Sequence, residues 1–298
     1  MKVGVILPIG TDKELGRPLP YTDIRAKAIQ IENVGLDTAW IPDHLIYRFP
    51  DQPQAGVWEA LTIMTGLAEA TERINIGSMV ICTAFRNPAV LAKIAVALDE
   101  VSNGRLVLGL GAGWHEPEFT AFGFPFNHLV DRFEEALKVI VPLVHGETVD
   151  FTGTYVSAPN CVMDPLPTRN IPILIASRRP RMLKLTAQYA DQWNTAWIGH
   201  VEALTERTDA LKAACDEVGR DYSAIAITVG VNIGFPDLTE LPETATDRTK
   251  FIAGSVEEIA EGLRAYADAG VAEIVAWLYP NTEEAIDRLA QAAKLARE

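Results

Sequence analysis

The sequence is poor in cysteine and histidine. Only 3 of its 298 residues are cysteine and 5 are histidine. Cys82, Cys161 and Cys215 are odd in number and far apart, which argues against a disulfide framework and fits a reducing cytoplasm. The histidines show no His-x-His or His-Glu-x-x-His spacing, and no cysteine pair supports zinc. A metal centre is therefore not expected.

Excess positive charge and long apolar runs are also missing. The formal net charge is −14, which argues against nucleic acid or an anionic membrane as a partner. No segment has the long uncharged apolar run of a membrane span. The N-terminus enters a strand-like run directly after Lys2, without the regions of a signal peptide. We therefore expect a cytoplasmic protein, in which a phosphate-bearing ligand needs a local basic patch.

Several motifs of common enzyme classes are absent as well. There is no Gly-x-Ser-x-Gly elbow for a hydrolase nucleophile. Neither a Walker A sequence nor a Gly-x-Gly-x-x-Gly after the first apolar run is present. A hydrolase triad and a Rossmann dinucleotide site are thus both unsupported.

What the chain does contain is a repeated pattern of short apolar run, loop, amphipathic helix and glycine. We predict strands at Val3–Pro8, Thr38–Pro42, Ile74–Ile81, Leu106–Gly111, Pro172–Ala176, Asp191–Asn194, Ile225–Val231 and Glu273–Leu278. Asn87-Pro88 predicts a helix start, and Ser255-Val-Glu-Glu258 fits a capping box.

Eight such units in 298 residues favour one (β/α)₈ TIM-barrel domain that spans residues 1–298. A doubly wound open sheet is the alternative. Three connections exceed the usual length, and we expect insertion loops after strand 2 (Tyr47–Gly56), helix 4 (Thr148–Asn170) and strand 7 (Asn232–Gly254). Residues 149–156 have the pattern of a hairpin. Loops after strands face the active end of a barrel, so the first and third are candidate substrate lids.

A glycine-rich strand end is the most informative stretch. Gly111 and Gly113 follow a buried apolar run and precede Trp114 and Glu118. Such glycines let a backbone run close to a bound molecule, which indicates a cofactor floor with a reactive rim. The alternative is that the glycines only permit tight packing.

Asp43 and His44 end the second predicted strand, where barrel enzymes keep catalytic groups. Histidine exchanges protons near neutral pH, and Asp43 could accept a hydrogen bond from the imidazole N–H. In the alternative reading, Asp43 caps the next segment and His44 only packs.

A basic cluster follows the fifth predicted strand. Ala176, Ser177, Arg178 and Arg179 precede a helix, and helix N–H groups with guanidinium groups would hold a phosphodiester or acidic tail. Arg86 is a second candidate. Surface ion pairs are the alternative.

The sequence resembles the bacterial luciferase-like oxidoreductases, in particular the branch that uses the deazaflavin coenzyme F420. The resemblance is carried by Trp40-Ile-Pro-Asp-His44, Phe85-Arg-Asn-Pro88, the segments 69–77, 98–105 and 108–119, and by Pro172-Ile-Leu-Ile-Ala-Ser177 and Tyr189-Ala-Asp-Gln-Trp-Asn194.

The resemblance implies a barrel, commonly homodimeric, with the cofactor ring in its mouth and a non-prolyl cis peptide near Ser78-Met79. Asp43 and His44 match positions that contact the cofactor and act as base in the sugar-phosphate dehydrogenases of this branch. We expect catalytic roles for His44, Asp43 and Glu118. The expected cofactor-binding set is Asp43, Ser78, Met79, Cys82, Thr83, Gly111, Gly113, Trp114, Ala176, Ser177, Arg178 and Arg179.

Two positions depart from those dehydrogenases. Trp114 stands where they place a glutamate, and Arg178-Arg179 stand where many relatives carry glycine. Three hypotheses follow: an F420-dependent oxidoreductase, an FMN-dependent monooxygenase that uses reduced flavin and O₂, and a non-catalytic flavin-binding protein. In both enzyme hypotheses the expected partner is a small-molecule substrate.

Overall fold

A computed structural model describes residues 1–12, 15–247 and 249–298. Its helices are α1 (Tyr21–Asn33), α2 (Ala60–Ala70), α3 (Pro88–Val101), α4 (Glu116–Phe122), α5 (Leu129–Val144), α6 (Pro180–Tyr189), α7 (Thr205–Val218), α8 (Val256–Asp268) and α9 (Glu283–Arg297). Its main strands are β1 (Lys2–Ile6), β4 (Thr38–Ile41), β7 (Asn75–Ser78), β8 (Ile81–Cys82), β9 (Leu106–Gly111), β12 (Ile173–Ala176), β13 (Gln192–Ile198), β14 (Ala226–Gly234), β15 (Phe251–Ala253) and β16 (Glu273–Tyr279). Short strands outside these are β2 (Thr11–Asp12), β3 (Arg17–Pro18), β5 (Ile46–Tyr47), β6 (Ala55–Gly56), β10 (Val149–Thr152) and β11 (Ser157–Cys161).

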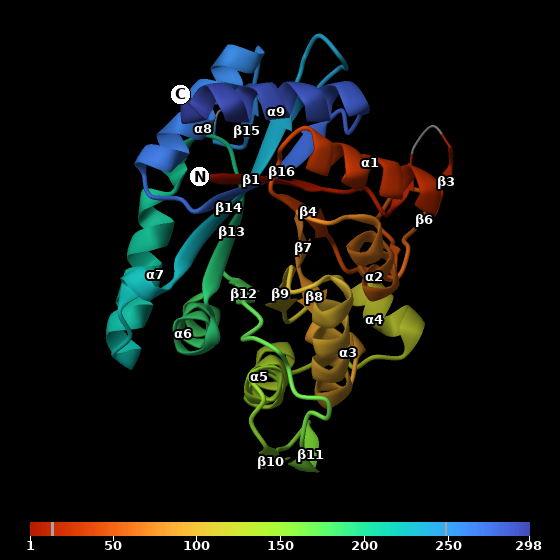
Figure 1. Cartoon of the computed structure of the whole chain (residues 1–298), viewed down its shortest axis with the longest axis vertical. Coiled ribbons are helices and arrows are strands. Elements are labelled where there is room, and N and C mark those ends of the chain that lie inside the picture. Colours follow the sequence, from red (N-terminus) through yellow and green to blue (C-terminus); the bar gives the residue numbers. More distant parts are fainter. Residues whose placement is uncertain (13–14, 248) are drawn as a thin grey trace. The chain divides into compact units, whose positions relative to one another are not determined.

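Contacts divide the described residues into two compact units. Unit 1 comprises residues 1–7, 26–40 and 176–298. Its parallel sheet has the order β13-β14-β16-β1-β4, and β15 pairs with β14. The helices α8 and α9, drawn in blue in Figure 1, pack on each other. Ser255 caps α8 in the predicted capping box with Glu258, because each side chain bonds the backbone N–H of the other residue.

Unit 2 comprises residues 8–25 and 41–175. Its parallel strands have the order β7-β9-β12, and β8 continues beside β9. All six residues of β9 are buried, as is typical of a central parallel strand covered on both faces. Asn87 caps α3 ahead of Pro88, as predicted. The hairpin β10–β11 lies beside α5 (Figure 1).

The predicted strand positions agree with the structure most closely at β9, whose bounds are those read from the sequence. The predicted strand Ile74–Ile81 is interrupted, since β7 ends at Ser78 and β8 begins at Ile81. A cis peptide joins Met79 to Val80, one position later than the resemblance implied.

Each of the three long connections contains residues of a strand. The hairpin β5–β6 begins at Ile46, one residue before the predicted loop Tyr47–Gly56, and ends with it. The hairpin β10–β11 lies within Thr148–Asn170, where a hairpin was predicted. The third, Asn232–Gly254, is shortened because β14 continues to Gly234 and β15 ends the connection. Arg248 of this loop lies outside the described residues. No helix among the described residues is long and apolar enough to cross a membrane.

Unit 1 contains a buried carboxyl group at the first residue of β16. Glu273 is 5% exposed, and Trp40 Nε1 donates a hydrogen bond to its Oε1 at 2.9 Å. Burial raises the pKa of Glu273 to about 7. A Cβ on Gly4 would lie 2.5 Å from Trp40 Nε1 and 2.8 Å from Glu273 Oε1. The pair therefore requires glycine at position 4.

Candidate active site

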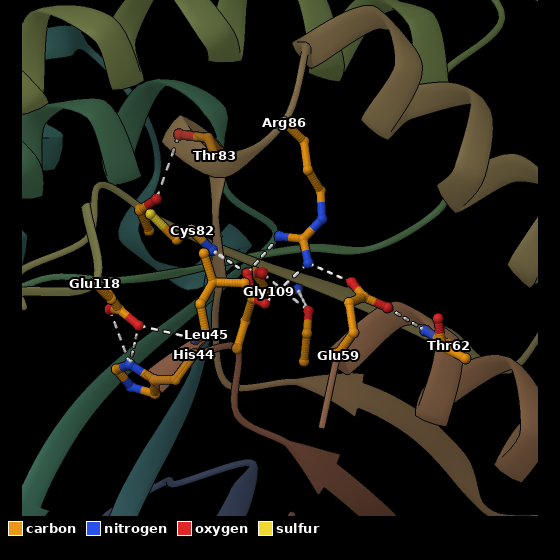
Figure 2. A network of polar contacts seen from close by, with 12 residues as sticks. His44, Leu45, Glu59, Thr62, Cys82, Thr83, Arg86, Gly109 and Glu118 are labelled. Carbon is orange, nitrogen blue, oxygen red and sulfur yellow. Dashed lines mark hydrogen bonds and ion pairs between the residues drawn. The ribbon is translucent and has the colours of Figure 1, made fainter. Parts of the chain in front are cut away.

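His44 of unit 2 is held by a buried carboxylate from α4. Its Nδ1 lies 3.1 Å from Glu118 Oε1 and 3.3 Å from Oε2 (Figure 2). The Leu45 N–H also donates to Glu118 Oε2 at 2.9 Å. Glu118 is 1% exposed, so the carboxylate is fixed by the chain itself. Because Nδ1 faces a carboxylate, it carries the proton of the neutral ring, and the lone pair of Nε2 is left to accept a proton.

Asp43 belongs to a different network. Its carboxylate accepts hydrogen bonds from Arg86 Nη1 at 2.6 Å, from Arg86 Nη2 at 2.9 Å and from the Cys82 N–H at 2.9 Å. The sequence-based expectation that Asp43 accepts from the His44 ring is wrong, because Glu118 takes that position. Spacing along the chain did not reveal this, since Glu118 lies 74 residues from His44.

Arg86 joins Asp43 to Glu59, and its Nη2 lies 2.5 Å from Glu59 Oε1 (Figure 2). Burial opposes its charge, but the hydrogen bonds with Asp43, followed by those with Glu59, raise the pKa of Arg86. Despite burial, the pKa of Glu59 is lowered by Arg86 and by the Thr62 N–H. Arg86 thus serves these two carboxylates, and the prediction that it binds a ligand anion is not supported.

The side chains of three other residues predicted to bind the cofactor, Ser78, Cys82 and Thr83, contact other residues of this chain. Ser78 Oγ donates to the Gly109 carbonyl at 2.9 Å and accepts the Gly109 N–H at 2.8 Å. Thr83 Oγ1 donates to the Gly111 carbonyl at 3.4 Å. Cys82 packs on Phe85 and Phe119, and burial raises the pKa of its thiol to about 12. This cysteine is a neutral packing residue at physiological pH.

The two glycines of the predicted cofactor floor are closely packed against neighbouring side chains. A Cβ on Gly111 would lie 2.6 Å from the Val80 side chain. A Cβ on Gly113 would lie 2.5 Å from Phe119 Cζ, and its φ of +84° favours glycine. At both positions a neighbouring side chain fills the space that a larger residue would need. Close packing alone therefore requires glycine at both positions, and their role in cofactor binding stays a prediction.

Five rings gather beside Glu118, and we call them the aromatic wall: His44, Tyr47, Phe49, Trp114 and His115. The ring centroids of His44 and Trp114 are 5.8 Å apart, and those of Phe49 and Trp114 are 6.3 Å apart and nearly parallel. His115 Nε2 accepts the Arg48 N–H at 3.1 Å, which fixes the loop after β4 to the segment after β9.

Two of these rings have shifted pKa values. Burial, followed by the charges of Glu118 and Asp43, raises the pKa of Tyr47, so its phenol stays protonated at neutral pH. Burial lowers the pKa of His115, which keeps Nε2 available as an acceptor. Sequence reasoning selected Trp114 but missed Tyr47, Phe49 and His115. The aromatic content of the Tyr47–Gly56 loop and the Trp114-His115 pair were the available signals.

The predicted basic cluster lies in unit 1. Ser177 is fixed by the chain, since its N–H donates to the Asn194 carbonyl at 3.2 Å and its Oγ lies 2.8 Å from Thr186 Oγ1. Ala176 ends β12, and Arg179 is the N-cap residue of α6 without a side-chain capping bond. Arg178 faces a cavity of about 340 Å³ that is also lined by Trp193, Glu206 and Arg207.

Arg207 is an additional cation that the sequence did not reveal. Its Nη1 donates to Thr195 Oγ1 at 2.6 Å and to the Ala196 carbonyl at 3.0 Å. Burial, followed by the positive charge of Arg178, lowers the pKa of Arg207. An anion in this cavity would relieve the repulsion between the two guanidinium groups.

Several curated relatives are similar to this chain. The F420-dependent glucose-6-phosphate dehydrogenase of Amycolatopsis mediterranei is 28% identical over 238 residues, which cover 78% of this chain and 69% of the relative. The F420-dependent glucose-6-phosphate dehydrogenase of Kineococcus radiotolerans is 30% identical, and the match covers 76% of this chain and 67% of the relative. A phthiodiolone/phenolphthiodiolone dimycocerosates ketoreductase of a Mycobacterium species is 30% identical, and the match covers 74% of this chain and 63% of the relative. The chain thus spans about two thirds of the length of these relatives.

Solved structures match the whole chain. An F420-dependent secondary alcohol dehydrogenase in complex with an F420-acetone adduct has a TM-score of 0.84 at 20% identity, and the match covers 100% of this chain and 99% of that one. The oxygenating constituent of 3,6-diketocamphane monooxygenase from Pseudomonas putida, in complex with FMN, has a TM-score of 0.76 at 17% identity, with 100% and 98% covered. These likenesses show the fold, and the predicted (β/α)₈ TIM barrel is confirmed.

The sequence profile of the luciferase-like monooxygenases matches residues 1–237, which is most of the chain. The matched part includes Glu118 and the whole aromatic wall. On this evidence the chain belongs to the luciferase-like monooxygenase family.

Proposed function

We propose that this protein is an oxidoreductase that transfers a hydride between coenzyme F420 and a small organic substrate. The observation that carries the proposal is the pair formed by His44 Nδ1 and the buried Glu118 carboxylate at 3.1 Å. This pair leaves His44 Nε2 as the atom that exchanges a proton. Relatives named as F420-dependent dehydrogenases support the choice of cofactor.

The residues of unit 1 fit the acidic part of such a cofactor. Arg178 and Arg207 line one cavity of about 340 Å³, and the pKa of Arg207 is lowered by burial and by Arg178. Two guanidinium groups that repel each other bind a phosphate or carboxylate favourably, because the anion neutralises both. Arg178 and Arg207 would therefore hold the anionic tail.

The residues of unit 2 handle the proton. His44 Nε2 would accept the hydroxyl proton when an alcohol is oxidised, and would return it when a carbonyl is reduced. Glu118 orients the ring and stabilises the imidazolium that forms. Asp43 and Arg86 brace the end of β4 against β8 through the Cys82 N–H. F420, when bound, supplies the acceptor or donor of the hydride.

Titration of the purified protein with F420, and separately with FMN, tests the choice of cofactor. The fluorescence of each cofactor reports binding, and we expect selective binding of F420. Selective binding of FMN would favour the monooxygenase hypothesis, with oxygen consumption as the next assay. Binding of neither cofactor would contradict both enzyme hypotheses.

His44→Ala tests the role of the proton-exchanging group. General acid–base catalysis contributes about 10²- to 10⁴-fold in rate, so turnover should fall by that factor while the Kd for F420 changes little. Turnover is followed by the absorbance of oxidised F420 against a panel of alcohols and sugar phosphates. His128→Ala, an exposed histidine that contacts Asp131 outside the wall, is the matched control. Unchanged turnover in His44→Ala would remove this residue from the mechanism.

We further propose that the chain forms a homodimer. Val101 on α3 and Leu166 line one surface cavity and are 46% and 63% exposed. Apolar side chains gathered on a surface mark protein contacts in soluble proteins. Light scattering of the purified protein should give twice the chain mass, and a monomer at micromolar concentration would contradict this proposal.

A further inference from the structure

We infer that the aromatic wall binds a flat, uncharged ring system of the substrate. The inference rests on the proposed function, and it names the class of molecule that the site accepts. Its basis is the position of two exposed rings, Trp114 and Phe49, beside the proton-exchanging His44.

The exposed part of the wall is not explained by the core of unit 2. Trp114 is 61% exposed and Phe49 is 39% exposed, whereas His115 behind them is buried. Their planes are inclined by 25°, with centroids 6.3 Å apart. Large aromatic side chains in this arrangement leave apolar area in water that a stacked ligand would cover.

The wall is also held in place before any ligand binds. Pairing of Ile46 with Gly56 and of Tyr47 with Ala55 closes the hairpin that carries Phe49. The Arg48 N–H donates to His115 Nε2, and the His115 ring lies 4.9 Å from that of Phe49. A preformed surface of this kind binds a rigid ligand with little loss of conformational freedom.

The position of His44 assigns the wall to the substrate. The group that exchanges a proton with His44 Nε2 must lie within hydrogen-bond reach of that atom. The His44 ring stands edge-on to Trp114, with centroids 5.8 Å apart and planes inclined by 80°. A substrate whose oxygen reaches Nε2 therefore lies next to the exposed Trp114 ring, which its adjoining carbon skeleton can cover.

The charges around the wall favour an uncharged ring. The carboxylates of Glu118 and Asp43 are buried nearby, and both raise the pKa of Tyr47. Of the nearby arginines, Arg86 bonds Asp43 and Glu59, and Arg48 donates from Nε to Gln54 Oε1 at 2.8 Å. Glu118 is paired with the His44 ring rather than with an arginine, so a phosphorylated sugar would bring its negative charge towards this carboxylate, and it would offer no flat face to the rings.

The experiment compares three probes by calorimetry: 2-acetonaphthone, its saturated analogue 2-acetyldecalin, and glucose 6-phosphate. Each is titrated into the protein with and without F420. We expect 2-acetonaphthone to bind about tenfold more tightly than 2-acetyldecalin, because ring pairs contribute free energy beyond the area that they bury. Glucose 6-phosphate should bind most weakly.

Variants separate stacking from simple burial. Trp114→Leu and Phe49→Leu should lose the preference for 2-acetonaphthone, while Trp114→Phe should retain it. Phe122→Leu removes another exposed ring of the same unit, 52% exposed on α4, and should leave the preference unchanged.

Three results would overturn the inference. These are tighter binding of glucose 6-phosphate, an unchanged preference in both leucine variants, and a Trp114→Leu variant that loses affinity for F420 but not for 2-acetonaphthone. The last would assign the wall to the cofactor. A protein that fails to bind F420 yet keeps the Trp114-dependent preference would refute the proposed function and still support the ring-binding wall.

Discussion

Replacement of Glu273 by glutamine should change how the stability of this protein depends on pH. The carboxyl group is 5% exposed, and burial raises its pKa from 4.5 to about 7. Between these two values the unfolded chain loses the proton while the folded chain keeps it, so stability falls as pH rises. At about 1.4 kcal/mol for each unit of pKa, the loss amounts to roughly 3 kcal/mol above pH 7.

Glu273→Gln removes this ionisation and keeps an oxygen that can accept the Trp40 N–H. The free energy of unfolding, measured in urea between pH 4.5 and 8, should therefore decline less in the variant than in the wild type. The difference between the two proteins isolates Glu273 from other titrating groups. Glu261→Gln, an exposed position on α8, should follow the wild type. A difference between Glu273→Gln and the wild type that stays constant across this range would refute the reasoning.

Two further predictions concern packing and charge in unit 2. Asp43→Asn should lower the free energy of unfolding by about 3 kcal/mol, because it leaves the half-buried Arg86 with one carboxylate partner, whereas Glu59→Gln at a more exposed position should cost less. Equal losses in urea denaturation would contradict this ranking. Gly111→Ala should cost about 1–3 kcal/mol, because its Cβ would lie 2.6 Å from Val80. Val80→Ala should recover part of that loss in the double variant, and simple additivity would argue against the contact.

The sequence predicted the local features of the fold well. The bounds of β9 and the capping box at Ser255 were both read from patterns that lie within a few residues. The repeated strand–helix pattern led to the barrel, which the solved structures confirm. Such features depend on side-chain alternation and on caps, which a single segment contains.

The partners of charged side chains were predicted less well. Proximity in sequence favoured Asp43 as the partner of His44, whereas the structure assigns Glu118 to that ring and Arg86 to Asp43. Both partners are far away in the chain, so only the folded backbone brings them together. Arg207 on α7 was missed for the same reason: it is far from Arg178 in the sequence, and only the fold brings both residues to one cavity. Roles in cofactor binding for Ala176, Ser177 and Arg179 stay predictions.

Asp43 and His44 are consecutive residues that belong to separate networks, one closed by Arg86 and the other by Glu118. The Asp43 carboxylate, which holds the segment after β4, is therefore not the carboxylate that orients the His44 ring, since Glu118 does so. The exposed rings next to His44 can therefore be replaced without loss of the hydrogen bonds that hold Asp43. If these rings bind the substrate as inferred above, their replacement changes substrate specificity while the contacts of Asp43 and Arg86 stay the same.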